Sequence, residues 1–297
     1  MKSRTTIKAG LGLAIILVFG AAQAQNPVQV KATQVSGNVY MITGQGGNIG
    51  LLTGSDGSFM VDDQFAPLTP KIIEACKSVG ADTPRFLINT HFHGDHTGGN
   101  ENLGRVGTLL MSHHAVRERL ANGSFIAAFG MKSPPANAAA LPTLTYADSM
   151  HLHLNGETVR IVHVPAAHTD GDSFVVFEKA NVVHAGDLYF NGFFPFIDAA
   201  NGGTMKGMIA GADAILALTD ASSKIIPGHG PLAARRDLQA YRDMLSTAYE
   251  RLLKLKNQGM SADEILFEEP LADLEQVWGG GTFDADKWIE IVYPAVR

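Results

Sequence analysis

The feature that most constrains this chain is a loop in which four potential metal ligands fall within six positions. Residues 90–100 read T-H-F-H-G-D-H-T-G-G-N and directly follow an apolar run that is typical of a buried strand. His91 and His93 are two residues apart, so their side chains point to one side of an extended backbone. The glycine after them lets the chain bend, so that Asp95 and His96 turn toward a neighbouring point. Four such ligands on one loop suit two adjacent metal ions.

Three more potential ligands stand at the ends of predicted strands farther along the chain. His168 follows the run P-A-A, Asp187 follows H-A-G, and His229 lies between two glycines in I-P-G-H-G. Loops at strand ends carry functional residues because rigid strands fix their positions. These three residues are therefore predicted to complete the site that the loop over 90–100 begins.

Hydrophobic periodicity divides the chain into two similar halves. Strands are expected over 38–43, 48–53, 58–62, 85–90 and 108–111 in the first half, and over 149–154, 157–164, 173–178, 181–185 and 224–227 in the second. Helices are expected over 67–79, 113–120, 205–218 and 232–257, and another begins at a Ser261 cap. Each half thus contains several strands, then a helix, then another strand. This order predicts two packed sheets with helices outside.

The segment over 130–147 gives no periodic signal. Two adjacent prolines, an alanine-rich stretch and Pro142 predict an irregular connector there. Two roles stay open for this connector, because it either covers the site as a lid or only links the two halves.

The motif, its order and its spacings resemble the metallo-β-lactamase superfamily over roughly residues 35–231. The resemblance implies an α/β fold, the αββα sandwich, in which two mixed sheets pack face to face with helices outside and metals at one edge. It also implies a ligand assignment for two zinc ions. The first ion would be held by His91, His93 and His168, the second by Asp95, His96 and His229, and Asp187 would bridge the two.

The charges of that ligand set agree with hydrolysis. Five neutral imidazoles and two carboxylates carry −2 against the +4 of two Zn²⁺ ions. The excess positive charge would stabilise a bridging hydroxide, the expected nucleophile, at neutral pH. Asp95 is the predicted catalytic residue, since it would both ligate a metal and orient the hydroxide.

The predicted substrate is a β-lactam, because the details of the chain resemble an exported, lactamase-like branch of the superfamily. No cysteine stands at Asp187, which excludes the cysteine-bearing subclass of these lactamases. Residues 188–205 hold no lysine or arginine to anchor a substrate carboxylate, so Lys206, Arg117 or Asn191 would have to substitute.

Other activities of the same superfamily stay open. A thioesterase or lactonase of the glyoxalase II type matches the bridging Asp187 well. An iron-dependent sulfur dioxygenase would use one metal and leave ligands idle. The net charge of −6 disfavours an RNA phosphodiesterase and nucleic-acid partners in general. A small-molecule substrate is therefore expected.

Five aromatic residues occur within the eight positions 189–196, directly after Asp187. They either line an apolar substrate pocket or pack beneath the site. The candidates for the pocket are Tyr189, Phe190, Asn191 and Phe193.

Several other polar residues receive a structural role. Asp62 ends a strand ahead of the site and is a candidate for orienting a ligand histidine. Asp170 and Asp172 are expected to cap the loop after His168. Cys76 is expected to be buried in a helix. The remaining histidines are expected on the surface or in the core: His113, His114, His151, His153, His163 and His184.

The first 24 residues resemble a secretory signal peptide. A basic start precedes an apolar run of only about a dozen residues, shorter than the roughly 20 that a spanning helix needs, and A-Q-A follows. We therefore expect export to a periplasm. Residues 25–297 are expected to form one metallo-β-lactamase-fold domain, detached from the membrane, with a helical tail over about 232–297.

Cleavage after Ala24 predicts that the exported protein begins at Gln25. N-terminal sequencing or intact-mass spectrometry of protein recovered from the periplasm tests this prediction. Recovery of chains that still begin at Met1 would contradict it.

Overall fold

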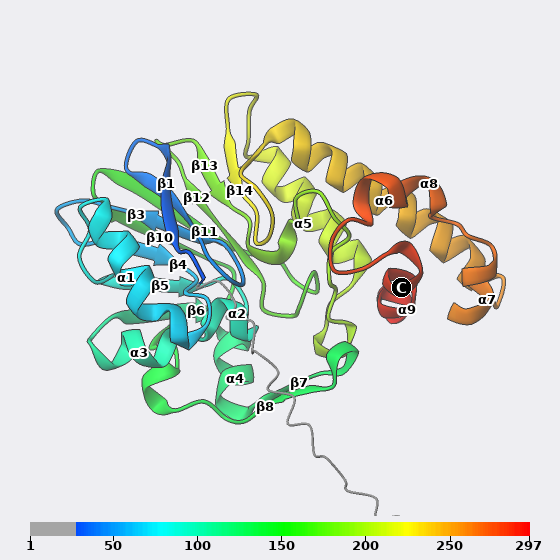
Figure 1. Cartoon of the computed structure of the whole chain (residues 1–297), viewed down its shortest axis with the longest axis horizontal. Coiled ribbons are helices and arrows are strands. Elements are labelled where there is room, and N and C mark those ends of the chain that lie inside the picture. Colours follow the sequence, from blue (N-terminus) through cyan, green and yellow to red (C-terminus); the bar gives the residue numbers. More distant parts are fainter. Residues whose placement is uncertain (1–27) are drawn as a thin grey trace, which may run out of the picture.

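The computed structural model describes residues 28–297, so the predicted signal peptide lies outside the described residues. Two β-sheets pack face to face, with helices on the outer side of each (Figure 1). The αββα arrangement predicted from the sequence is thereby confirmed. Within residues 28–297, no helix combines the length and the apolar character needed to span a membrane.

The first sheet has seven strands in the order β1-β2-β3-β4-β5-β6-β9. Strands β1 to β4 form an antiparallel meander, and β4, β5, β6 and β9 run parallel to one another. The bounds are β1 Lys31–Ser36, β2 Val39–Thr43, β3 Ile49–Leu52, β4 Phe59–Val61, β5 Phe86–Asn89, β6 Leu109–His113 and β9 Leu144–Tyr146.

The second sheet has six strands in the order β10-β11-β12-β13-β14-β15. Only β13 and β14 pair in parallel, and the other neighbours are antiparallel. The bounds are β10 Ser149–Leu154, β11 Glu157–His163, β12 Ser173–Phe177, β13 Val182–His184, β14 Lys224–Ile226 and β15 Ala233–Ala234.

Alternating side chains of the first sheet reach two different cores. Val39 and Met41 of β2 pack between the sheets, whereas Ile42 of the same strand packs under the outer helices. In β5, Ile88 faces the second sheet and Leu87 faces the helices. Both faces of these strands are therefore buried, which explains why their sequences read as continuous apolar runs.

Helices cover the outer face of each sheet (Figure 1). The helices over the first sheet are α1 Thr69–Ser78 and α3 Asn100–Arg105. Helix α4, His114–Asn122, lies nearby and is followed by a glycine. The second sheet is covered by α5 Met205–Ala217 and α6 Arg235–Asn257, followed by α7 Ala262–Phe267, α8 Ala272–Trp278 and α9 Ala285–Val292. Ser261 caps α7 as predicted, and Cys76 is buried in α1, where burial raises the pKa of its thiol to about 12.

The irregular-connector prediction for 130–147 is wrong in part, because residues 131–133 and 144–146 form strands, whereas 134–137 and 141–143 are irregular as predicted. Strands β7 Ser124–Ile126 and β8 Met131–Ser133 form a small hairpin, and β9 then joins the edge of the first sheet in parallel with β6. Each of these strands is only three residues long, too short for a period to show in the sequence. Strand β1 and helix α3 are likewise additions to the predicted elements.

The C-terminal helices are fixed to the fold by Trp288 of α9. Its fully buried ring stacks on Phe194 with centroids 4.4 Å apart, and its Nε1 donates to the carbonyl oxygen of Pro195 at 2.6 Å. Because Phe194 and Pro195 belong to the segment that follows Asp187, this contact joins the tail to the neighbourhood of the predicted site.

Trp288→Ala should lower the free energy of unfolding by about 3–5 kcal/mol, because it leaves a cavity and an unpaired carbonyl. Urea unfolding followed by circular dichroism measures the change. Trp278→Ala, at a half-buried ring of α8, is the matched control and should cost less. Equal losses for the two variants would contradict the anchoring role of Trp288.

Candidate metal centre

Asp62, at the end of β4, holds the loop that follows β5 through hydrogen bonds. One carboxylate oxygen of Asp62 accepts from the backbone N–H of Thr90 at 2.7 Å, and the other accepts from the Thr90 hydroxyl at 2.8 Å. The chain then enters the one-turn helix α2 (Gly94–Thr97), which turns Asp95 and His96 back toward the side chains before it. Local hydrogen bonds thus give the loop the bend that the glycine permits.

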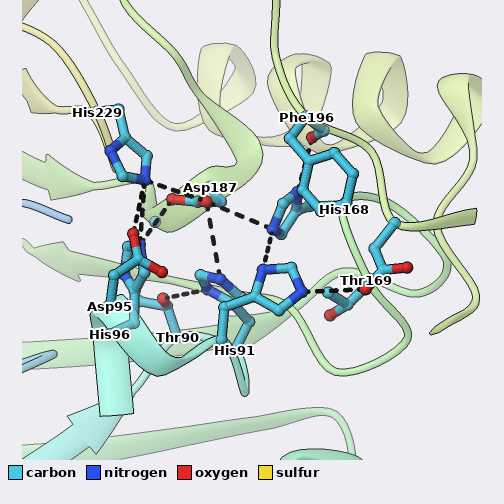
Figure 2. A network of polar contacts seen from close by, with 12 residues as sticks. Thr90, His91, Asp95, His96, His168, Thr169, Asp187, Phe196 and His229 are labelled. Atoms are coloured by element: carbon cyan, nitrogen blue, oxygen red, sulfur yellow. Dashed lines mark hydrogen bonds and ion pairs between the residues drawn. The ribbon is translucent and has the colours of Figure 1, made fainter. Parts of the chain in front are cut away.

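All seven predicted ligands come together at one edge of the two sheets, and Figure 2 labels all of them except His93. They form two adjacent groups in which the candidate donor atoms of each group lie within 4.8 Å of one another. One group is His91, His93, His168 and Asp187, and the other is Asp95, His96 and His229.

The first group surrounds a point next to Asp187. Nε2 of His168 lies 2.9 Å from Nδ1 of His93. Oδ2 of Asp187 lies 3.4 Å from the same His168 nitrogen and 3.7 Å from Nε2 of His91. Three imidazole nitrogens and one carboxylate oxygen therefore converge, which is a donor set that suits a divalent transition metal.

The second group lies on the other side of Asp187. Nε2 of His229 is 3.4 Å from Oδ2 of Asp95 and 3.3 Å from Nε2 of His96. Asp187 also reaches this group, since its Oδ1 lies 3.1 Å from Nε2 of His96 and its Oδ2 lies 3.4 Å from Nε2 of His229. The carboxylate of Asp187 thus stands between the two groups, within reach of both.

The pKa shifts of the first group fit metal binding, whereas nearby carboxylates, Asp187 foremost, raise the pKa of His96 and of His229, so that a metal ion would displace a proton from those two rings. Burial lowers the pKa of His91 well below its usual value and lowers that of His168 to about 4, so both rings are neutral at pH 7, as ligands must be. Burial alone would raise the pKa of the Asp187 carboxyl, but the neighbouring His96 and His229 hold it well below its usual range. Nε2 of His91 is buried without a hydrogen-bond partner, which a metal ion would satisfy.

Asp62 also orients one of the candidate ligands. Its Oδ2 lies 2.7 Å from Nδ1 of His96, which leaves Nε2 of that ring to face the second group. A carboxylate in this position fixes the tautomer and the orientation of a ligating imidazole. The role predicted for Asp62 is therefore confirmed by the contact.

Asp198 does the same for His93 and was not predicted from the sequence. Its Oδ2 lies 3.1 Å from Nε2 of His93, so Nδ1 of that ring faces the first group. Asn201 donates to the same carboxylate oxygen at 2.6 Å and to the carbonyl oxygen of Phe125 in β7 at 3.0 Å. Asp198 is 105 positions from His93 and lies in no motif, so no local signal could have indicated it.

The other polar residues mostly take the structural roles expected. Asp172 accepts from the N–H and the hydroxyl of Thr169 and so caps the loop after His168. Asp170 instead pairs with Arg119, with its Oδ2 at 2.5 Å from Nη2, so its predicted capping role is wrong. His184 is buried, and its Nε2 contacts the backbone oxygen of Asn48 at 3.0 Å.

A cavity of about 660 Å³ opens beside both groups and is lined by four of the candidate ligands: His93, Asp95, Asp187 and His229. Phe190 and Phe193 line it, in agreement with the prediction. Tyr189 does not, because it is fully buried with its ring centroid 5.0 Å from that of Tyr241. Asn191 does not either, because its amide donates to the carbonyl oxygen of Pro231 and its side-chain oxygen accepts from the Tyr189 hydroxyl.

The cation that faces this cavity is Lys132 of β8, which the sequence did not indicate. Lys206 instead lies over the ring of Tyr249, 5.8 Å from its centroid, and Arg117 donates to the carbonyl oxygen of Pro142. Neither of these two predicted substitutes lines the cavity. The hairpin over 124–133 thus brings the positive charge that the segment after Asp187 lacks.

Asp198→Ala should weaken zinc binding about 10–100-fold, because His93 loses the partner that orients it. Competition with a chromophoric chelator measures the affinity without any assay of activity. Asp213→Ala, which removes an exposed carboxylate paired with Arg242, is the control and should leave the affinity unchanged. An unchanged affinity in Asp198→Ala would show that the contact with His93 is dispensable.

Sequence comparisons find an acyl-coenzyme A thioesterase and a hydroxyacylglutathione hydrolase among the curated relatives. Acyl-coenzyme A thioesterase MBLAC2 of Homo sapiens is 24% identical over 213 residues, which cover 63% of this chain and 74% of that protein. Hydroxyacylglutathione hydrolase of Nitrosococcus oceani is 28% identical over 146 residues, which cover 48% of this chain and 47% of that protein.

Solved structures show the same fold. DIM-1 metallo-beta-lactamase matches with a TM-score of 0.59 at 16% identity, over 74% of this chain and 99% of that one. A double mutant of the sec-alkyl sulfatase PisA1 matches with a TM-score of 0.70 at 17% identity, over 89% of this chain and 50% of that one. The family model described as the metallo-beta-lactamase superfamily matches residues 32–251. The chain therefore belongs to the metallo-β-lactamase superfamily, whose members named here include metal-dependent hydrolases.

Proposed function

We propose that the protein is a dinuclear zinc hydrolase that cleaves an acyl bond, with a thioester as the favoured substrate. One observation carries the dinuclear part of the proposal: the buried carboxylate of Asp187 stands between two groups of ligands and reaches both. Nitrogen and oxygen donors of this kind suit zinc. The ligand assignment is the one that the resemblance to the superfamily implies, in which Asp187 would bridge the two ions.

Different residues of the chain have different roles in the proposed hydrolysis. When bound, two zinc ions would supply a deprotonated water as nucleophile and a Lewis acid for the substrate carbonyl. Asp95 has a quarter of its side chain exposed and lines the cavity, so it can accept a proton there and return it to the leaving group. Asp62 and Asp198 hold two ligand rings in place from behind the site.

The thioester preference rests on the curated relatives. One is named a thioesterase for acyl-coenzyme A and another a hydrolase of hydroxyacylglutathione. The β-lactamases among the solved structures are 14–20% identical, and likeness at that level carries the fold alone. Thioester hydrolysis therefore stands ahead of the β-lactam hydrolysis that the sequence suggested first.

β-Lactam hydrolysis is the second candidate, because the cavity can also receive a substrate that carries a carboxylate. Lys132 lines the cavity and can pair with the carboxylate that such substrates carry. The same charge also suits an anionic thioester, so Lys132 does not choose between the two.

Purified mature protein should contain about two zinc ions per chain by plasma mass spectrometry and should lose activity in chelator. The His91→Ala variant should retain one zinc ion or none. Its turnover should fall at least about a hundredfold, because His91 belongs to the first group of ligands. Release of thiol from acyl thioesters and hydrolysis of nitrocefin are assayed side by side.

His151→Ala, on the exposed strand β10, is the control and should keep both metals and activity. Full metal content in His91→Ala would contradict the ligand assignment. A single bound iron would replace the hydrolase proposal with the oxygenase alternative. Nitrocefin turnover without thioester turnover would reverse the order of the two candidate substrates.

A further inference from the structure

The cavity beside the metal centre has an apolar wall built from three segments that are distant in the sequence. We call this set of side chains the aromatic wall. The segment after Asp187 supplies Phe190, Phe193, Phe194 and Phe196, the β7–β8 hairpin supplies Ile126, Phe129 and Met131, and the C-terminal tail supplies Phe283.

Phe129, in the turn of the hairpin, connects the other two segments. Its ring centroid lies 4.8 Å from that of Phe196 and 6.2 Å from that of Phe283, whose ring is nearly parallel to it. Phe283 is buried, whereas Phe129 is 43% exposed and lies at the rim. The hairpin and the tail therefore close the cavity together.

The tail is held close to the wall by its backbone. The N–H of Phe194 donates to the carbonyl oxygen of Trp278 at 2.8 Å. At Gly281 a side chain would meet Cβ of Phe193 at 2.5 Å, so only glycine permits this approach. The position of Phe283 is thus fixed by these contacts before it and by the contacts of Trp288 after it.

The chemistry of the lining defines what the cavity can hold. Besides the four candidate ligands, the polar side chains that line it are Lys132, Ser133 and Thr282. A volume of about 660 Å³ lies within the range of small-molecule sites. An apolar group of the substrate would displace water from phenylalanine rings there while its reactive carbonyl faces the ligands.

We infer that the aromatic wall receives the apolar acyl group of the substrate, and that Phe283 and Phe129 determine the preferred acyl length. The substrate class is then a medium-chain or aromatic acyl thioester, so the inference rests on the proposed function. Phe283 lies beyond residues 32–251, the part matched by the family. The tail therefore contributes to substrate selection in addition to stabilising the fold.

The test uses the zinc-loaded mature protein and N-acetylcysteamine thioesters with acyl chains of two, eight and twelve carbons. In the wild type, kcat/KM should rise from two to eight carbons. In Phe283→Ala, the ratio of eight-carbon to two-carbon kcat/KM should fall about tenfold, as if about two methylene groups were left without apolar contact. Val277→Ala is the control, since this exposed tail residue lies outside the cavity and should leave the ratio unchanged.

Binding of octanoate by calorimetry separates this inference from the proposed function, because it needs no turnover. Octanoate binding that weakens in Phe283→Ala supports the wall even if no thioester is cleaved. Thioester cleavage with equal kcat/KM at all lengths and no octanoate binding overturns the wall and leaves the proposed function standing. If Phe283→Ala proves unstable, Phe129→Ala at the exposed rim must give the same change in ratio, and its failure to do so also overturns the inference.

Discussion

The site depends on the buried carboxylate of Asp62. Its two oxygens accept from the N–H and the hydroxyl of Thr90, and one of them also contacts Nδ1 of His96. Asp62 itself has a left-handed backbone with φ of 61°, which a non-glycine residue adopts at a cost of about 1–3 kcal/mol. Removal of this carboxylate would free both ends of the turn between His91 and His96. The four candidate ligands of that turn would then lose their fixed positions.

The two sheets must also keep a fixed relation, because each contributes ligands to the same small volume. Asn48, which precedes β3, provides this connection by donating through its amide to the carbonyl oxygens of Pro227 and Gly230, on either side of His229. Its own carbonyl oxygen contacts Nε2 of His184, next to the loop of Asp187. A residue that reaches both second-sheet loops thus holds them in register with the first sheet.

The sequence sufficed for features that short-range physics determines. Apolar runs such as 86–89 and 173–177 located the buried strands, and the crowding of ligand types in residues 91–96 located the metal loop. Asp198 and Phe283 were missed because their roles arise only when distant segments meet. Strand β9 was missed because three residues at a sheet edge show no period. Tyr189 was misplaced because an aromatic run does not reveal which of its rings face inward.

The ligands and the aromatic wall have different structural origins. The ligands stand at the ends of central strands, whereas part of the wall comes from a hairpin and a tail at the periphery. Peripheral segments accept insertions and substitutions that central strands do not. Selectivity can therefore diverge between relatives, or be redesigned in the laboratory, through the hairpin and tail while the catalytic centre is inherited unchanged.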